Sequence, residues 1–161
     1  MMNGAAYAAV FVQEGKRAAP GSDTLLLPEW RIDDWRKLLA GTTVKPFRTS
    51  DVVIQRGVEE RVLYFIAAGT LEVGVTTFDG VSISQLARIG PVSVIGEQSF
   101  FDGQPRSANV WAVTSGTLLR WELQAFDKFG AQEPRLARDV IFAVARVLSM
   151  RLRMTTIRVR R

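Results

Sequence analysis

The segment GEQSFFDGQPRSANV, from Gly96 to Val110, concentrates polar side chains that could bind an anion. Arg106 offers a planar fork of donors that suits two phosphate oxygens, and Ser107 adds a hydroxyl donor. Gly96 permits a left-handed backbone or a close approach to a ligand. The letters EQSFF can form one helical turn, whose free N–H groups attract an anion. Glu97 is an acceptor, so it suits a sugar hydroxyl better than a phosphate.

These side chains support two interpretations. A ligand that carries a phosphate beside a ribose hydroxyl would satisfy all of them at once. Alternatively, Glu97 and Arg106 could simply pair with each other across a polar loop. The segment by itself leaves both interpretations open.

The composition limits the chemistry. With 161 residues, 47% of them apolar and 23% charged, the chain is typical of one folded domain. It contains no Cys and no His, which excludes disulfides, thiol nucleophiles, imidazole bases and the zinc sites that need these ligands. No nucleophile and base stand together in the sequence, so we expect no enzyme, no metal and no cofactor.

The apolar stretch at residues 5–12 is far shorter than the roughly twenty residues of a membrane helix, so we expect a cytoplasmic protein without membrane contact. The net charge of +5 equals the charge of five arginines that lie after residue 150. The rest of the chain is therefore neutral overall, and we do not expect it to bind nucleic acid. The five residues of this basic tail are Arg151, Arg153, Arg158, Arg160 and Arg161.

Hydrophobic periodicity divides the chain into four parts. Residues 1–28 are small, polar and turn-prone in their second half, which predicts a flexible N-terminal arm. Residues 29–40 follow a helical pattern that begins near Pro28. Residues 42–122 alternate short β-rich runs with glycine turns such as Phe78–Gly80, and residues 124–161 predict C-terminal helices that end in the basic tail. The pattern predicts a mainly β fold, an antiparallel β jelly roll with an N-terminal helix and a long C-terminal helix.

The C-terminal part carries apolar residues at alternating spacings of four and three, and Pro134 stands where its helix could begin. One line could cover the β domain while the other meets a second copy of the chain, or both could form a single wide core face. The first line consists of Leu136, Val140, Ala143, Val147, Met150, Met154 and Ile157. The second consists of Ala137, Ile141, Val144, Leu148 and Leu152.

The order strand, GEQSFFDGQPRSA, strand resembles the phosphate-binding cassette of the cyclic nucleotide-binding domain family, which includes the cyclic-AMP receptor proteins. The upstream segment DVVIQRGVEERVLYFIAAGTLEV adds a second match, because Asp51, Gly57, Tyr64, Ile66 and Gly69 stand in the family's places. The resemblance covers about residues 38–152. It implies a β jelly roll flanked by helices, the same fold as the periodicity predicts.

The resemblance also implies a role for each polar residue of the cassette. The backbone at Gly96 would meet a cyclic phosphate, and Glu97 would accept from the ribose 2′-hydroxyl. Arg106 would pair with the phosphate charge, and Ser107 would donate to a phosphate oxygen. Ser rather than Thr at position 107 favours cyclic AMP over cyclic GMP. The expected ligand site comprises Gly96, Glu97, Gln98, Ser99, Arg106, Ser107 and Ala108.

The base-binding end of the site is less defined. Thr155 and Thr156 could reach the base or lie on exposed helix surface, and Leu152 could cover the base as an apolar lid. Ser50 and Val92 stand where the family commonly has Gly. The candidate base contacts are Val94, Ile95, Leu152, Thr155 and Thr156.

No residues remain after the long helix for the DNA-binding helix-turn-helix domain that the family's transcription factors carry. We therefore expect a stand-alone sensor, or the sensor part of a longer protein, that binds cyclic AMP and signals to a separate protein through rearrangement of its C-terminal helix. A homodimer through that helix is a further expectation. The alternative is a ligand-free, dimeric interaction module of the same fold that uses its basic tail.

Overall fold

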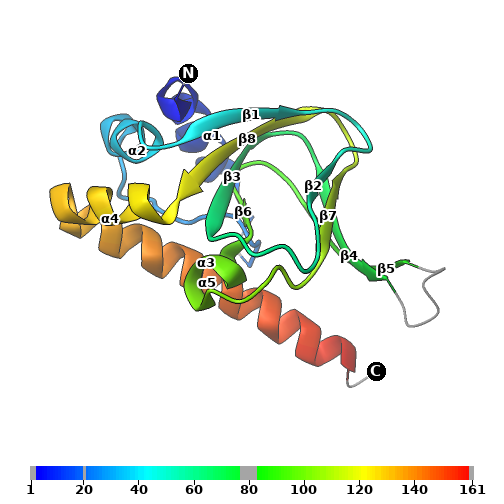
Figure 1. The fold of residues 1–161 in the computed structure, drawn as a ribbon. Helices are drawn as coiled ribbons and strands as arrows, with labels where there is room; N and C mark the ends of the chain where they lie inside the picture. Colours follow the sequence, from blue (N-terminus) through cyan, green and yellow to red (C-terminus); the bar gives the residue numbers. More distant parts are fainter. Residues whose placement is uncertain (1–2, 20, 77–82, 160–161) are drawn as a thin grey trace.

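The computed structural model describes residues 3–19, 21–76 and 83–159. Its β domain consists of two four-stranded antiparallel sheets that share one core (Figure 1). The first sheet has the order β1 (Thr43–Phe47), β8 (Gly116–Glu122), β3 (Val62–Ala68) and β6 (Val94–Ile95). The second has the order β2 (Val52–Ile54), β7 (Asn109–Ala112), β4 (Leu71–Thr76) and β5 (Ile83–Ile89). The predicted jelly roll is confirmed.

Strand β3 is the centre of the molecule, because it is buried on both of its faces. Alternate side chains of a strand point to opposite sides of the sheet. Val62, Tyr64 and Ile66 lie in the core between the two sheets. Leu63 and Phe65 lie in a second core, on the side where the helices cover the sheet.

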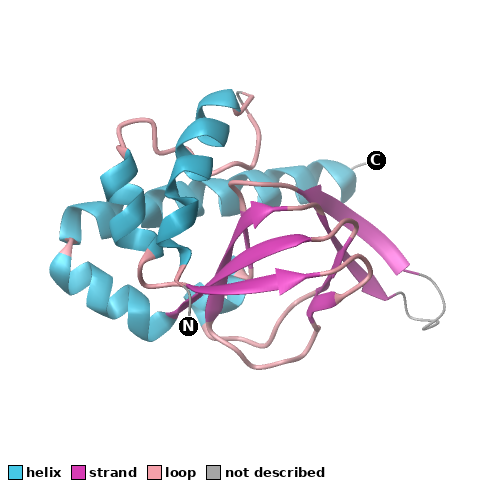
Figure 2. Ribbon diagram, turned by 90° about the horizontal axis from the view of Figure 1, so that it is seen from above, coloured by secondary structure: helices cyan, strands magenta, loops and turns pink. Residues whose placement is uncertain are grey.

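The helices gather on the outer face of the first sheet, as Figure 2 shows from above. An aromatic cluster around Trp121 of β8 joins them to the strands. The ring of Trp121 lies 5.5 Å from those of Phe65 and Phe126 and 6.0 Å from that of Phe100. The helices are η1 (Gly4–Tyr7), α1 (Ala8–Arg17), α2 (Ile32–Leu39), α3 (Glu97–Asp102), α4 (Leu123–Gln132) and α5 (Pro134–Val159).

The N-terminal residues differ from the flexible arm that we expected over residues 1–28. Residues Gly4–Arg17 form η1 and α1, and the side chain of Phe11 is buried between Trp35 and Phe65, at 4.9 and 6.3 Å between ring centroids. Alanine is the strongest helix former, and the alanine-rich stretch 5–12 forms a helix once a core is available to it. The N-terminal part is therefore part of the folded domain.

The N-terminal helix predicted over residues 29–40 begins later than expected. Helix α2 starts at Ile32, where the backbone N–H of Arg31 donates to Asp34 at 2.9 Å, and Pro28 lies in a turn before it. The expected start of α5 at Pro134 agrees with the structure. None of the described helices is both long and apolar enough to cross a membrane.

The two apolar lines of α5 merge into one core face over its first half. Both Val147 of the first line and Val144 of the second are buried. Beyond them, Leu152, Met154 and Ile157 are more than half exposed. The predicted turn at Phe78–Gly80 and the arginines at positions 160 and 161 lie outside the described residues.

The packing of Phe11 generates a stability prediction. We expect Phe11→Ala to lower the free energy of unfolding by about 3–5 kcal/mol, because it leaves a cavity among aromatic rings. Gln13→Ala, at an exposed position of the same helix, should change it by less than about 0.5 kcal/mol. Chemical denaturation of the three proteins measures both effects. Equal stability of Phe11→Ala and the parent would show that α1 is not packed as described.

Candidate functional site

A cavity of about 430 Å³ opens between the second sheet, α3 and the last turns of α5. This volume lies in the range of small-molecule sites. The seven residues of the expected ligand site all line the cavity, which brings residues 96–99 and 106–108 together. Its apolar wall comes from the strands and includes Ile54, Val73, Ala87, Ile89, Ile95 and Val110.

Gly96 fixes the start of α3, and its backbone has the left-handed conformation with φ of 80°. A Cβ atom there would lie 2.5 Å from Nη1 of Arg106 and 2.8 Å from the carbonyl oxygen of Val62. Only glycine fits this position without displacing the arginine. The first turn of α3 then carries Glu97, which is buried, and Gln98, which is exposed.

The guanidinium group of Arg106 is buried beneath the cassette, with only 3% of the side chain exposed. Its Nη1 donates to the carbonyl oxygen of Gly96 at 2.9 Å, and its Nη2 donates to that of Val62 at 2.8 Å. Among the described residues, its buried Nε has no hydrogen-bond partner. The Nε–H of Arg106 thus lacks an acceptor among the described residues, while hydrogen bonds from Nη1 and Nη2 hold α3 on β3.

Glu60 supplies the negative charge that the buried Arg106 requires. One oxygen of Glu60 lies 3.3 Å from Nη2 of Arg106, and the other lies 3.0 Å from Nη2 of Arg120. Burial by itself raises the pKa of Glu60, but the hydrogen bonds and charges of the two arginines outweigh it and hold the pKa below its ordinary value. Glu60 is therefore ionised at neutral pH.

The backbone around Arg106 is held by the upstream motif. The N–H of Gly57 donates to the carbonyl oxygen of Arg106 at 2.8 Å, and the N–H of Arg106 donates to that of Val58 at 2.9 Å. The next side chain, Ser107, donates its hydroxyl to Oε1 of Gln98 at 2.7 Å. The glycine that the sequence singled out at position 57 thus positions the cassette.

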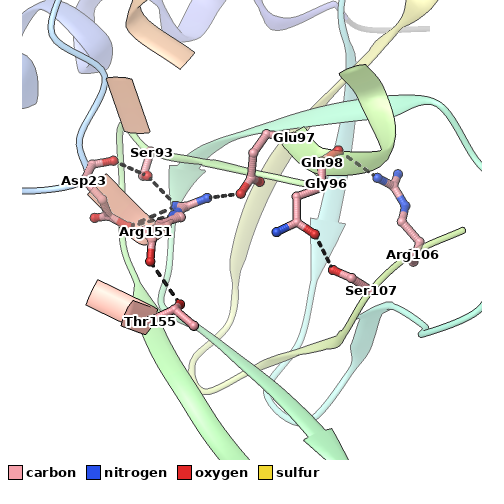
Figure 3. A network of polar contacts seen from close by, with 9 residues as sticks. All are labelled: Asp23, Ser93, Gly96, Glu97, Gln98, Arg106, Ser107, Arg151 and Thr155. Carbon is pink, nitrogen blue, oxygen red and sulfur yellow. Dashed lines mark hydrogen bonds and ion pairs between the residues drawn. The ribbon is translucent and has the colours of Figure 1, made fainter. Parts of the chain in front are cut away.

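Arg151 of α5 is the centre of a polar network on the other side of the cavity (Figure 3). Its Nη1 lies 2.9 Å from Oε1 of Glu97. Its Nε and Nη2 donate to Oδ2 of Asp23 at 3.2 and 2.9 Å, and Nη2 also donates to the hydroxyl of Ser93 at 3.1 Å. Glu97 therefore pairs with Arg151, and Arg106 pairs with Glu60, so the ion pair between Glu97 and Arg106 that the sequence left open does not form.

The candidate base contacts divide into two groups. Ile95 and Thr155 line the cavity, and Thr155 donates its hydroxyl to the carbonyl oxygen of Arg151 at 3.0 Å. Val94 lies in the core beneath the helices instead, because neighbouring residues of a strand face opposite ways. Leu152 and Thr156 are exposed and do not line the cavity, because a helix turns them away from the face of Thr155.

Several lining residues were not expected from the sequence. Asp23 lies in the segment interpreted as a flexible arm, so its type and position carried no signal. Arg151 was counted in the basic tail and was not among the candidate base contacts, although its place one residue after the apolar line at Met150 sets it on the inner side of α5. The unexpected polar or small residues are Gly21, Asp23, Arg88, Arg151 and Arg158.

Ser50 and Val92 adopt positive φ values of 74° and 63°, at the two places where the family commonly has Gly. Such a backbone is strained for a β-branched residue, at a cost of about 1–3 kcal/mol. The N–H of Val92 donates to Ile66 at 2.8 Å, and its carbonyl accepts from Leu25 at 2.8 Å. These contacts hold the turn that leads into β6 and the cassette.

The site offers a buried unpaired donor, a buried carboxylate and an apolar wall around one cavity. These groups suit a ligand with an anionic part, a hydroxyl and an apolar or aromatic part. Among the described residues, no three acidic side chains gather where they could hold a metal ion. The chemistry that the site supports is recognition.

Comparison with known proteins gives the following matches. A family model for the cyclic nucleotide-binding domain matches residues 44–133. Glutaminase 1 of Bradyrhizobium diazoefficiens is 28% identical over 127 residues, which are 79% of this chain and 20% of that protein. The CRP-like cAMP-activated global transcriptional regulator of Mycobacterium tuberculosis is 30% identical over 93 residues, which are 58% of this chain and 39% of the regulator. The chain thus spans less than half the length of either relative.

A solved structure of similar fold is a cyclic nucleotide-binding domain from Methylobacillus flagellatus. The two structures superpose with a TM-score of 0.81 at 20% sequence identity, and the superposition covers 97% of this chain and 84% of the solved chain. Because it covers nearly all of this chain, the likeness of fold extends beyond the residues of the family model.

The pairing of Glu60 generates a pH prediction. The pKa of Glu60 is lower in the folded state, so in acid the unfolded chain binds more protons than the folded chain does. The stability that ionised Glu60 contributes is therefore present above its unfolded pKa and is lost as the pH falls through its folded pKa. We expect Glu60→Gln to lower the unfolding temperature at neutral pH, and the difference from the parent to narrow as the pH falls below 4.5, the ordinary pKa of the carboxyl group. Glu59→Gln, at the exposed neighbouring position, should follow the parent throughout. A difference that stays constant with pH would contradict the ion pair.

Proposed function

Because the chain belongs to the cyclic nucleotide-binding domain family, we propose that it binds cyclic AMP in the cavity between the cassette and α5. The role is regulatory rather than catalytic. The observation that carries the proposal is the buried Nε of Arg106, an unpaired donor on a cationic group that lines the cavity. A phosphate oxygen would supply the acceptor that this group lacks.

Glu97 supports the ribose part of the proposal. Its carboxylate is buried beside the cavity, and its Oε1 lies 2.9 Å from Nη1 of Arg151. A carboxylate has two oxygens, and each is a strong acceptor for a hydroxyl. In a cyclic nucleotide the phosphate and the ribose 2′-hydroxyl lie side by side, so one ligand could place its phosphate near Arg106 and its hydroxyl near Glu97.

The preference for cyclic AMP rests on Ser107 and on one relative. Ser rather than Thr at position 107 agrees with an adenine base by resemblance to the family. The M. tuberculosis regulator, which is described as cAMP-activated, is 30% identical over the matched region. Cyclic GMP is the second candidate ligand.

The composition of the cavity wall supports the proposal that the chain signals through α5. Residues 150–158 of α5 contribute Met150, Arg151, Met154, Thr155 and Arg158 to it. A ligand that touches these residues binds one placement of the helix better than another, so binding shifts the helix toward that placement. A partner protein that contacts α5 would then detect the ligand.

The apolar line of α5 supports a second copy of the chain as a partner. Met154 and Ile157 continue the heptad spacing of the buried residues beyond the point where the β domain covers the helix. A dimer through this part of α5 would bury them. The same surface would serve the alternative function, a ligand-free dimeric module.

Titration calorimetry tests the ligand directly. We expect the parent to bind cyclic AMP with micromolar or tighter affinity, and cyclic GMP more weakly. Glu97→Gln should weaken binding of cyclic AMP by at least about tenfold, because it removes a charged acceptor of a buried hydrogen bond. Gln104→Ala, an exposed residue of the same segment that does not line the cavity, should bind as the parent does. Absence of heat with both nucleotides would refute the sensor function and favour the ligand-free module.

Sedimentation velocity tests the dimer. We expect Ile157→Glu to convert a dimer into monomer, because it places a charge in the apolar seam. Thr156→Glu adds the same charge at the neighbouring position, outside the seam, and should remain dimeric. A parent that sediments as a monomer at all accessible concentrations would reject pairing through α5.

A further inference from the structure

Arg151 makes two hydrogen bonds to Asp23, a residue of the N-terminal segment. Two of its three guanidinium nitrogens, Nε and Nη2, donate to Oδ2 of Asp23. The third, Nη1, lies 2.9 Å from Oε1 of Glu97. Two carboxylates thus compete for one arginine at the edge of the cavity. Asp23 accepts from two of its nitrogens, whereas Glu97 lies beside one.

Asp23 is held in place by its own backbone. Its carbonyl oxygen accepts the hydroxyl of Ser93 at 2.6 Å. The carbonyls of Ser22 and Thr24, on either side of it, both accept from Nη1 of Arg146 at 3.3 Å. Leu25 anchors the segment in the core, with 1% of its surface exposed. The carboxylate of Asp23 therefore projects from a fixed wall of the cavity, which it lines together with the cassette.

We propose that Asp23 is a positioning residue of the nucleotide site, which holds Nε and Nη2 of Arg151 away from Glu97 and so leaves the Glu97 carboxylate open to recognise the ribose 2′-hydroxyl. The inference rests on the proposed function. It assigns a role in ligand discrimination to the N-terminal segment, which lies outside the region matched by the family model.

The physical reason lies in the geometry of arginine and carboxylate. A guanidinium that faces a carboxylate with nothing else to bind takes the bidentate arrangement, with two parallel hydrogen bonds to both oxygens. In the intact site Nε and Nη2 of Arg151 donate to Asp23, so Asp23 competes with Glu97 for the nitrogens that this arrangement needs.

Without Asp23, Arg151 is free to pair with both oxygens of Glu97. The ligand hydroxyl then has to displace a charged donor from a buried carboxylate, which cancels most of the gain from its own hydrogen bond. Cyclic AMP then loses the affinity that it gains from this hydrogen bond. The affinity of 2′-deoxy cyclic AMP, which has no hydroxyl at that position, does not depend on it.

The experiment compares the affinities of cyclic AMP and 2′-deoxy cyclic AMP by titration calorimetry. In the parent we expect cyclic AMP to bind roughly tenfold or more tightly than the deoxy analogue, as for one hydrogen bond to a charged acceptor. In Asp23→Ala we expect the ratio to fall to within about threefold, mainly through weaker binding of cyclic AMP. A purely structural role of Asp23 would weaken both ligands equally and leave the ratio unchanged.

Asp33→Ala is the matched control, because Asp33 also pairs with an arginine, Arg36 at 2.9 Å, but on an exposed face of α2 away from the cavity. It should retain the ratio of the parent. If Asp23→Ala does not fold, Asp23→Asn keeps the shape of the side chain and removes its charge, and its ratio should fall in the same direction.

The outcomes separate the two proposals. If the parent discriminates between the two nucleotides and the Asp23 variant discriminates equally well, the role of Asp23 is overturned and the proposed function stands. A parent that binds both nucleotides equally overturns the recognition of the hydroxyl, and with it the role of Asp23. A parent that binds neither nucleotide overturns the proposed function and the present inference together.

Discussion

The burial of Arg106 is the constraint on which the rest of the site depends. A guanidinium cannot lose its charge, so a buried one needs a counter-ion and acceptors from several elements at once. Glu60 provides the charge, and the carbonyls of Gly96 and Val62 provide the acceptors. Because these groups come from the loop before β3, from β3 and from the start of α3, satisfying the arginine also fixes the cassette against the sheet.

The two ends of the cavity are built on the same principle but from different parts of the chain. At one end, Glu60 joins Arg106 to Arg120 of β8, so every partner belongs to the β domain or its loops. At the other end, Arg151 joins Glu97 to Asp23, so the partners come from the cassette, α5 and the N-terminal segment. The first end has the stiffness of a sheet, whereas the second depends on how two terminal parts of the chain dock. Any ligand that spans the cavity therefore connects the β domain to the two terminal parts of the chain.

Local patterns predicted the fold and the cassette, because both are encoded in short stretches of sequence. Alternation identified the strands, glycines marked the turns, and GEQSFFDGQPRSA carried the residues from Gly96 to Ala108 that line the cavity. The misses have a common physical cause. Packing of Phe11 against β3 decides that the N-terminal residues are ordered, and the pairing of Asp23 with Arg151 depends on positions far apart in the sequence. Such contacts leave no periodic signal in a single chain, and neither does the choice between Glu97 and Glu60 as the partner of Arg106.

The link between Asp23 and Arg151 joins positions 128 residues apart, which orders events during synthesis. At about 5–20 residues per second, a ribosome adds Arg151 roughly 6–26 seconds after Asp23. Strands and cassette are synthesised in that interval, but neither Glu97 nor Asp23 yet has an arginine from α5. The last strand, β8, ends at Glu122, so a nascent chain has all of its strands before it has a complete cavity. A chain truncated before α5 would keep the cassette but lack Arg151, the partner of both Glu97 and Asp23.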